Sequence, residues 1–241
     1  MEAREGQSMG RGFIGWMSSN RPIPARMRRF ILGTLRKKNI AVLLYNDPMR
    51  SEVFSLIGKV KNERDMLLGD TEAYQIHMAV RQTAKVSGDI AEVGVYQGGS
   101  SMLICKAKGE KHLHLFDTFE GIPSVQSIDK FRQGQFASQL EETQNYLKNE
   151  ENVHFYKGIF PDTAGPIEDR TFSFVHLDVD TYESTAACVE FFYPRMNTGA
   201  VMISHDYIPA KGVRKAFDEF FAERPEPVIE MSGTQCMIVK T

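Results

Sequence analysis

The stretch Glu92-Val-Gly-Val-Tyr-Gln-Gly-Gly-Ser-Ser101 decides the fold of this chain. It starts inside a short apolar run, Ile90–Val95, and continues directly into a helical pattern over Ser100–Lys108. A buried strand that turns through glycines into a helix is the first half of a βα unit, the building block of parallel sheets. Gly94 and Gly98 are four positions apart, which differs from the spacing of dinucleotide-binding turns. The stretch therefore predicts an α/β fold and disfavours a dinucleotide site.

The alternation of short apolar runs and helical stretches continues towards the C-terminus. Further strands are predicted at His112–Phe116, Val153–Tyr156, Phe172–Leu177 and Gly199–Ser204. Further helices are predicted at Gln135–Asn149, Glu183–Tyr193 and Gly212–Arg224. Val228–Met231 and Gln235–Val239 flank the turn dipeptide Ser232-Gly233, which predicts a hairpin. The chain is thus expected to form a Rossmann-like, mostly parallel sheet that ends in an antiparallel hairpin strand.

The composition is that of a globular protein that binds small molecules. The 241 residues are 42% apolar and 25% charged, with a net charge of -2. This near-neutral balance argues against nucleic-acid binding, which usually needs a basic surface. The cysteines Cys105, Cys188 and Cys236 form no CxxC pair, so we expect buried free thiols in a reducing compartment. Neither a long apolar run nor a signal peptide is seen, so we expect a cytoplasmic protein without stable membrane insertion.

The part before the βα units differs in composition. Residues 1–24 are rich in Gly, Ser, Arg and Pro and predict a loose arm, and residues 52–85 predict one or two helices. Between them, Ala25–Val42 alternates basic and apolar residues, which predicts a basic amphipathic helix. Such a helix either contacts a membrane surface or a partner or, as we favour, packs against its own domain. We divide the chain into a helical extension, residues 1–69, and a domain, residues 70–241.

The glycine turn is the first candidate binding element. Gly94, Gly98 and Gly99 allow the backbone to turn sharply and to approach a ligand closely. The following helix offers free N–H groups to a carboxylate, and Glu92 offers a carboxylate to an amino group. Together they suit the methionine end of a ligand. The alternative is a tight strand-to-helix turn that binds nothing.

Asp117 is the second candidate binding residue. It lies just past the predicted strand His112–Phe116, about twenty residues beyond the glycine turn. A carboxylate at this distance can accept hydrogen bonds from both ribose hydroxyls of a nucleoside. The alternative is that Asp117 caps a helix.

Four ionisable residues follow the last two parallel strands. Asp178 and Asp180 alternate after one strand and would point to the same face if the strand continued. His205 and Asp206 follow the next strand. Two carboxylates and an imidazole at one sheet edge predict a Mg²⁺ or Mn²⁺ site of Asp178, His205 and Asp206, and Asp178, Asp180 and His205 are candidate bases. The alternative is that Asp178 and Asp206 cap the next helices.

Several stretches together resemble the macrocin O-methyltransferase family of S-adenosylmethionine (SAM)-dependent sugar O-methyltransferases, which modify glycosylated natural products. They lie between about Asp70 and the C-terminus. The matching segments are residues 88–100, Phe116-Asp-Thr-Phe-Glu-Gly-Ile-Pro123, Tyr156-Lys-Gly-Ile-Phe-Pro-Asp-Thr163, Leu177-Asp-Val-Asp-Thr-Tyr-Glu-Ser-Thr185, Asp206-Tyr207 and residues 212–217. The first seventy residues match poorly; such regions build lids and oligomer contacts in the family, which is compatible with a homo-oligomer.

The resemblance implies the class I SAM-dependent methyltransferase fold and its sites. The SAM pocket would be formed by Glu92, Gly94, Tyr96, Gly98, Ser100, Asp117 and Thr118, with Gly158 and Phe160 beside the adenine. The divalent metal, usually Mg²⁺, would be held by Asp178, His205 and Asp206. His205 stands where the family usually has aspartate, and with this softer imidazole Mn²⁺, Fe²⁺ or Zn²⁺ is an alternative to the expected Mg²⁺.

The resemblance implies an enzyme that transfers a methyl group from SAM to a sugar hydroxyl of a small-molecule glycoside. A catechol or another diol would suit the same metal site as an acceptor. A non-catalytic partner protein with the same fold is a further alternative, which the cluster of ionisable residues disfavours. Residues 122–149 are interpreted either as a mobile cover over the acceptor or as a surface loop and helix.

Overall fold

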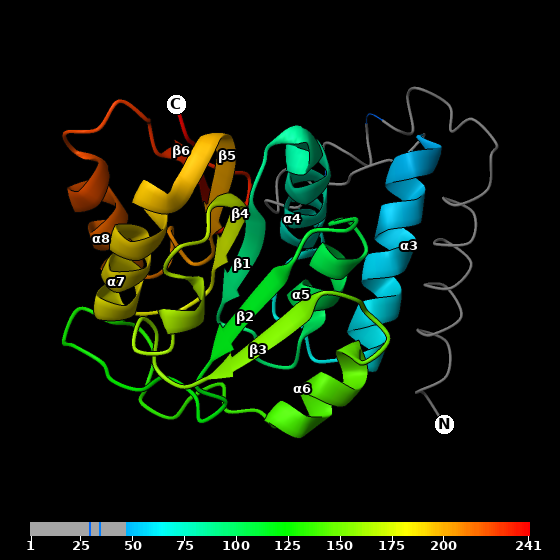
Figure 1. Cartoon of the computed structure of the whole chain (residues 1–241), viewed down its shortest axis with the longest axis horizontal. Helices are drawn as coiled ribbons and strands as arrows, with labels where there is room; N and C mark the ends of the chain where they lie inside the picture. Colours follow the sequence, from blue (N-terminus) through cyan, green and yellow to red (C-terminus); the bar gives the residue numbers. More distant parts are fainter. Residues whose placement is uncertain (1–28, 30–33, 35–46) are drawn as a thin grey trace. The chain divides into compact units, whose positions relative to one another are not determined.

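The computed structural model describes Arg29, Thr34 and residues 47–241 (Figure 1). The chain divides into one unit of residues 1–46 and another of residues 47–241, and the fold described here is that of the second unit. Apart from Arg29 and Thr34, the predicted arm and the predicted basic helix Ala25–Val42 lie outside the described residues. None of the helices that the structure describes is long and apolar enough to cross a membrane.

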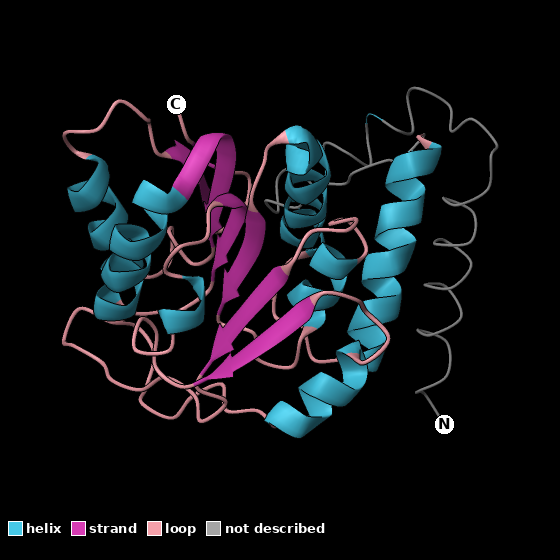
Figure 2. Cartoon of the chain, viewed as in Figure 1, coloured by secondary structure: helices cyan, strands magenta, loops and turns pink. Residues whose placement is uncertain are grey.

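Within residues 47–241 the strands form one sheet in the order β3-β2-β1-β4-β5-β7-β6 (Figure 2). The strands are β1 (Asp89–Val93), β2 (Leu113–Asp117), β3 (Val153–Lys157), β4 (Phe172–Leu177), β5 (Met196–Ser204), β6 (Ile229–Glu230) and β7 (Cys236–Val239). β1 to β5 pair in parallel, whereas β7 pairs antiparallel with both β5 and β6. The predicted α/β fold with an antiparallel C-terminal hairpin is thereby confirmed.

Helices cover both faces of this sheet (Figure 1). Four helices pack against one face of the sheet and share one buried hydrophobic cluster with it: α3 (Pro48–Glu63), α4 (Asp70–Gln82), α5 (Gly99–Cys105) and α6 (Leu140–Leu147). The other face packs against α7 (Tyr182–Phe192) and α8 (Lys211–Phe221). Short 3₁₀ turns lie at Thr83–Lys85, Gly165–Ile167 and Tyr193–Arg195. The predicted boundary at residue 69 remains a prediction, but α3 shares the buried cluster of α4 and α5.

Side chains that alternate along the strands pack against the helices on both faces of the sheet. In β1, Ile90 packs with the α3–α6 layer and Ala91 with the α7–α8 layer. Phe172 and Phe174 of β4 face opposite layers because the register shifts between them. All six residues of β4 are buried, as expected for a central strand that is covered on both sides.

After residue 88, the starts of two elements differ from the predictions by three residues or more. The strand predicted to begin at Gly199 begins at Met196, because Met196 already pairs with Phe172 of β4. The helix predicted from Gln135 begins only at Leu140. Residues 135–138 instead hydrogen-bond to the preceding loop, with Ile122 N–H donating to the Gln135 carbonyl.

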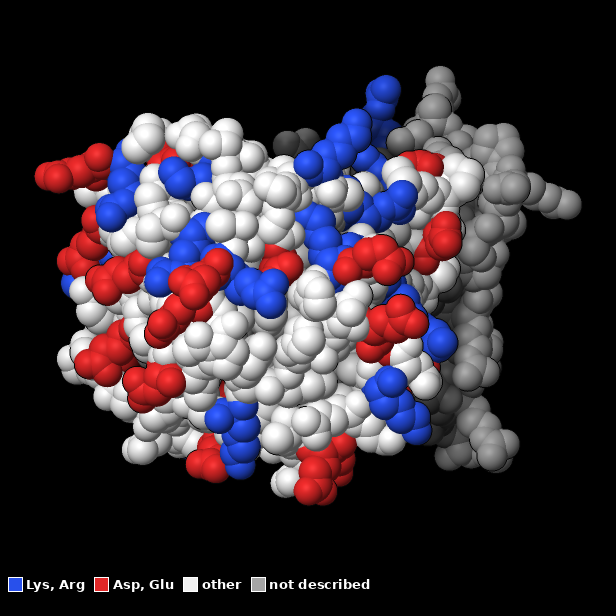
Figure 3. All heavy atoms as spheres, viewed as in Figure 1, with Lys and Arg blue, Asp and Glu red and all other residues white. Residues whose placement is uncertain are grey.

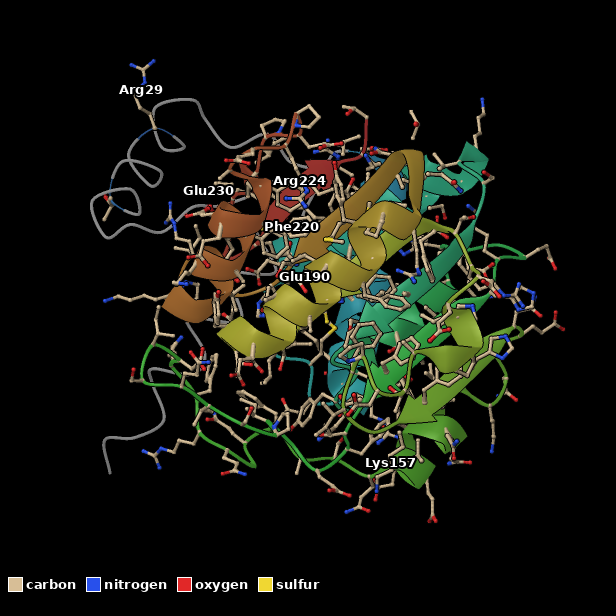
Figure 4. All side chains as sticks on the ribbon, turned by 60° about the vertical axis from the view of Figure 1, so that its left-hand side comes forward. Arg29, Lys157, Glu190, Phe220, Arg224 and Glu230 are labelled. Atoms are coloured by element: carbon tan, nitrogen blue, oxygen red, sulfur yellow. The ribbon has the colours of Figure 1, made fainter. Side chains whose placement is uncertain are left out.

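The surface of the described residues carries charges of both signs. On the face shown in Figure 3, acidic and basic side chains are interspersed, in keeping with the near-neutral composition. Just after α8, the guanidinium of Arg224 lies 3.5 Å from the ring centroid of Phe220 (Figure 4). This cation–π contact, together with a hydrogen bond from Arg224 to the Phe220 carbonyl, stabilises the end of the helix.

At Gly94, the chain segment that follows β1 is in direct contact with the segment that follows β4. Gly94 has a φ of +90°, and a Cβ atom added there would lie 1.9 Å from the carbonyl oxygen of Asp178. Asp178 N–H donates to the carbonyl of Val93 at 2.8 Å, which holds the two segments together. Only glycine satisfies both the left-handed backbone and the close approach.

The Gly94→Ala variant is expected to lose about 3 kcal/mol or more of unfolding free energy, because it adds a steric clash to an unfavourable φ. Gly109→Ala is the matched control: Gly109 has a φ of +60°, but a Cβ atom added there would meet nothing within 4 Å, so the expected loss is only about 1–2 kcal/mol. Chemical denaturation measures both values. Equal losses in the two variants would contradict the steric argument.

The three thiols are expected to be inert in the folded protein. Cys105, Cys188 and Cys236 are free and buried, as predicted. Burial raises the pKa of Cys105 to about 12 and raises the pKa values of the other two further. Since the thiolate is the reactive form, Ellman's reagent at pH 8 should label none of them until the chain is unfolded, and then all three. Rapid labelling of a cysteine in the native protein would contradict this burial.

Candidate functional site

A pocket of about 300 Å³ opens at the carboxyl ends of β1, β2, β4 and β5. This is the sheet edge at which ligands bind in open α/β folds. The structure brings most of the predicted site residues into its lining: Gly94, Tyr96, Ser100, Asp117, Thr118, Gly158, Phe160, Asp178, Asp180, His205 and Asp206. Glu92 and Gly98 do not line it. The predicted SAM-binding and metal-binding residues therefore share one cavity.

The glycine turn forms one wall of the pocket. Gly98 adopts a left-handed conformation with a φ of +79° and is the N-cap of α5. Gly99 and Ser100, the first residues of that helix, line the pocket. The positive end of the helix therefore lies at the pocket wall, as the sequence predicts. Gly98 supplies the bend that turns the helix start towards the pocket.

Asp117 fixes the glycine turn from the neighbouring strand. Its Oδ2 accepts hydrogen bonds from the N–H groups of Val95 at 2.7 Å and Tyr96 at 2.8 Å, and its Oδ1 accepts one from Phe119 at 2.6 Å. Burial raises the pKa of Asp117, whereas these three donors favour its charged form. It caps no helix, since the N-cap of the next helix, α6, is Gln139. Its contact with a ribose remains a prediction.

Glu92 lies behind the pocket wall. Its Oε2 accepts a hydrogen bond from the hydroxyl of Ser101, and its Oε1 lies 2.9 Å from Nδ1 of His176. Glu92 and His176 are fully buried. This differs from the predicted direct contact with an amino group, because partners from α5 and β4 engage both carboxylate oxygens. In the sequence, the one indication of this hydrogen bond is Ser101, a short polar residue in the helix that follows the glycine turn.

The four ionisable residues after β4 and β5 meet in an adjoining wall of the pocket. Nδ1 of His205 lies 3.0 Å from Oδ1 of Asp178 and 3.7 Å from Oδ2 of Asp206. One ligand atom from each of these three residues falls within a group less than 4.8 Å across. Carboxylate and imidazole ligands at such separations fit a divalent cation. The donor set thus fits the metal that the sequence predicts.

The turns after these strands differ from the predicted geometry. β4 ends at Leu177, so Asp178 and Asp180 do not alternate along a continuing strand. Instead, Asp180 and Asp206 both adopt left-handed backbone conformations, with φ values of +66° and +57°. Neither Asp178 nor Asp206 caps a helix, because the N-caps of α7 and α8 are Thr181 and Ala210. The alternative that they serve as helix caps is therefore wrong.

The electrostatics of this wall depend on the packed carboxyl groups. Burial, and then the charges of Asp178 and Asp206, raise the pKa of Asp180 to about 9. Burial opposes the charge on His205, but the neighbouring Asp178 carboxylate outweighs it and raises the pKa of His205 to about 11. The same pairing lowers the pKa of Asp178 in spite of its burial. The packed carboxyl groups therefore resist ionising together, a repulsion that a bound cation would relieve.

Residues 118–139 run across the pocket between β2 and α6. Phe131, Gln135 and Phe136 from this segment line the cavity. Asp129 accepts a hydrogen bond from the N–H of Tyr182 at 2.9 Å, and the Ser138 hydroxyl donates to the Tyr96 carbonyl at 2.8 Å. The part of the predicted cover up to α6 therefore contributes to the pocket and is not simply a surface loop.

Two groups of site residues could not be found from the sequence. The loop Asp65–Leu68 before α4 lines the pocket, although nothing in its sequence indicates a ligand. Glu72 of α4 lies 3.6 Å from Nε2 of His205. The only sequence signal for Glu72 is its place three residues after Gly69 at a helix start, which indicates a capping residue.

Residues 64–237 match the family described as Macrocin-O-methyltransferase (TylF). Demethyldecarbamoylnovobiocin O-methyltransferase of Streptomyces niveus is 28% identical over 218 residues, which cover 77% of this chain and 83% of the relative. An enzyme of Streptomyces olivaceus, 8-demethyl-8-(2,3-dimethoxy-alpha-L-rhamnosyl)-tetracenomycin-C 4'-O-methyltransferase, is 30% identical over 169 residues. This second match covers 62% of this chain and 64% of the relative.

Solved structures show the same architecture. The O-methyltransferase NovP superposes with a TM-score of 0.64 at 27% identity, covering 73% of this chain and 82% of that one. The calicheamicin methyltransferase CalS11 superposes with a TM-score of 0.61 at 17% identity over 92% of this chain and 98% of that one, a likeness of fold alone. The sheet order, the shared pocket and the match over most of the sequence agree, and the chain belongs to the macrocin O-methyltransferase family of SAM-dependent O-methyltransferases.

Proposed function

We propose that this enzyme methylates a sugar hydroxyl of a glycosylated natural product, with a divalent cation, Mg²⁺ or Mn²⁺, at Asp178, His205 and Asp206. The observation that carries the proposal is the single cavity that joins the glycine turn to the cation ligands. The names of the relatives point to such acceptors: a novobiocin precursor, a rhamnosyl tetracenomycin and mycinamicin III. The buried free thiols further support a reducing compartment, the cytoplasm.

The residues of the pocket divide between donor and acceptor. Gly94, Ser100 and Asp117 would hold SAM at the turn after β1, beside the hydrophobic ring of Phe160. Phe131 and Phe136 offer apolar surface to an acceptor from the segment above. When bound, SAM supplies an electrophilic methyl group, and the cation lowers the pKa of the acceptor hydroxyl. Fixing donor and acceptor in line can remove about 7–11 kcal/mol from the barrier in favourable cases.

Among the three candidate bases, the geometry favours Asp180. Both ring nitrogens of His205 face carboxylates, Asp178 at 3.0 Å and Glu72 at 3.6 Å. Asp178 in turn is engaged by His205. Asp180 also lines the pocket and is the candidate base that is not assigned to the cation. Its carboxyl group shares a hydrogen bond with Asp206, and a cation held by Asp206 would favour the ionised form of Asp180, which is the form that accepts a proton. General base catalysis of this kind contributes about 10²- to 10⁴-fold to the rate.

Replacing Asp178 by alanine should abolish turnover, because it removes a cation ligand, and should leave SAM affinity within about threefold of wild type. Methyl transfer to glycoside acceptors and SAM calorimetry measure the two effects. Asp169→Ala, at an exposed position outside the pocket lining, is the control.

Removal of divalent cations with a chelator should also abolish turnover in the wild type, and added Mn²⁺ or Mg²⁺ should restore it. Unchanged turnover in Asp178→Ala would overturn the cation role. Methylation of catechols, with no methylation of glycosides, would overturn the sugar acceptor. Binding of SAM without turnover on any acceptor would favour the non-catalytic partner protein.

Asp117→Asn should destabilise both the fold and the SAM site. An amide in place of the carboxylate removes the negative charge that accepts three N–H groups, and it sets an NH₂ donor against some of them. We expect a loss of about 2–4 kcal/mol of unfolding free energy, because hydrogen bonds to charged groups are worth about 1.5–3 kcal/mol each. Denaturation and SAM calorimetry on the same sample, well below the melting temperature, measure both effects. Wild-type stability together with wild-type affinity would contradict this role.

A further inference from the structure

His205 lies between two sets of carboxylates that belong to different parts of the chain. Its Nδ1 faces Asp178 at 3.0 Å and Asp206 at 3.7 Å, on the pocket side. Its Nε2 faces Glu72 of α4, at 3.6 Å. The side chain of His205 is only 11% exposed, so few other groups can reach the ring. Each ring nitrogen therefore has a distinct acidic environment.

Glu72 is held rigidly by groups other than His205. Its Oε1 accepts hydrogen bonds from the N–H and the hydroxyl of Thr234, at 2.6 and 2.7 Å. Its Oε2 accepts one from the N–H of Gly69 at 2.7 Å. Gly233 lies so close that a Cβ atom there would be 2.6 Å from Oε1. The turn of the C-terminal hairpin thus forms a cradle that fixes the carboxylate against the ring.

This arrangement determines which ring nitrogen can bind a cation. Glu72 lies on the Nε2 side of the ring, in the place of a carboxylate that orients a metal-binding histidine from the nitrogen that does not bind the metal. Nδ1 is the ring nitrogen that faces the other two ligand residues, Asp178 and Asp206. In an octahedral site with bonds of about 2.1 Å, adjacent ligand atoms are about 3 Å apart. The separation of 3.0 Å between Nδ1 and Asp178 matches that value, whereas Asp206 lies farther away, at 3.7 Å.

We propose that Glu72 is a positioning residue that presents Nδ1 of His205 as a nitrogen ligand, and that the resulting site prefers Mn²⁺ to Mg²⁺. The inference rests on the cation site of the proposed function and adds to it the ring nitrogen that binds, the role of Glu72 and a metal preference. Imidazole suits transition metals, whereas Mg²⁺ takes oxygen ligands almost exclusively. The O/N/O donor set of Asp178, His205 and Asp206 therefore discriminates between the two ions.

Metal titrations of the full-length protein and pulsed EPR of the Mn²⁺ complex test the proposal without an activity assay. The wild type should bind Mn²⁺ at least tenfold more tightly than Mg²⁺, and electron spin echo modulation should reveal a directly coordinated ¹⁴N nucleus. His205→Asp should lose the ¹⁴N coupling and reduce the preference for Mn²⁺. Since both wild-type measurements stand alone, they remain decisive if a variant fails to fold.

Glu72→Gln tests the positioning role. It keeps the shape of the side chain but removes the charge beside Nε2, so Mn²⁺ affinity should fall about 10- to 100-fold and the ¹⁴N coupling should change. Glu226→Gln is the matched control, because Glu226 is also buried and holds a C-terminal segment through Lys240 and Thr241, outside the pocket lining. It should cost stability without altering Mn²⁺ binding.

The outcomes separate this inference from the proposed function. Mn²⁺ binding without ¹⁴N coupling, or equal affinity for both ions, would overturn the nitrogen ligand and leave the cation site standing. Unchanged Mn²⁺ affinity and coupling in Glu72→Gln would overturn the positioning role. A wild type that binds neither ion would overturn the cation site itself, and the inference with it.

Discussion

The contact between the backbones of residues 94 and 178 is the constraint on which the rest of the site depends. β1 and β4 are neighbours at the centre of the sheet, and their chain segments remain in contact beyond the last paired residues. One segment continues into the glycine turn and the other into the acidic residues. The absence of a side chain at Gly94 therefore lets the glycine turn and the acidic residues line one cavity.

Much of the fold follows from local patterns that the sequence displays directly. Each parallel strand is short, apolar and followed by turn residues, because a central strand covered on both faces has no polar side to interrupt the run. Asp178, His205 and Asp206 could be predicted as neighbours because parallel strands end at one edge. Asp180 was predicted less well, because its expected orientation required β4 to continue beyond Leu177, whereas the chain turns there.

Contacts between distant segments could not be predicted in the same way. Glu72 has the sequence context of an ordinary helix start, and its contacts with Thr234 and His205 depend on how α4, β5 and the hairpin pack. Asp117 and Glu92 were predicted at the correct strand ends, but their hydrogen-bond partners come from neighbouring segments. For a similar reason, α6 begins at Leu140 and not at the predicted Gln135, since tertiary hydrogen bonds of residues 135–138 outweigh helix propensity.

The cradle around Glu72 has a consequence for the order in which the parts of the site form. Glu72 and Thr234 are 162 positions apart in the sequence, whereas Asp117 lies only 22 positions after Val95, whose N–H group it accepts. Closing a long loop costs more entropy than closing a short one, so contacts between distant segments tend to form late in folding. The glycine turn can therefore be fixed before the hairpin closes on α4, and the metal selectivity that depends on Glu72 would be acquired last.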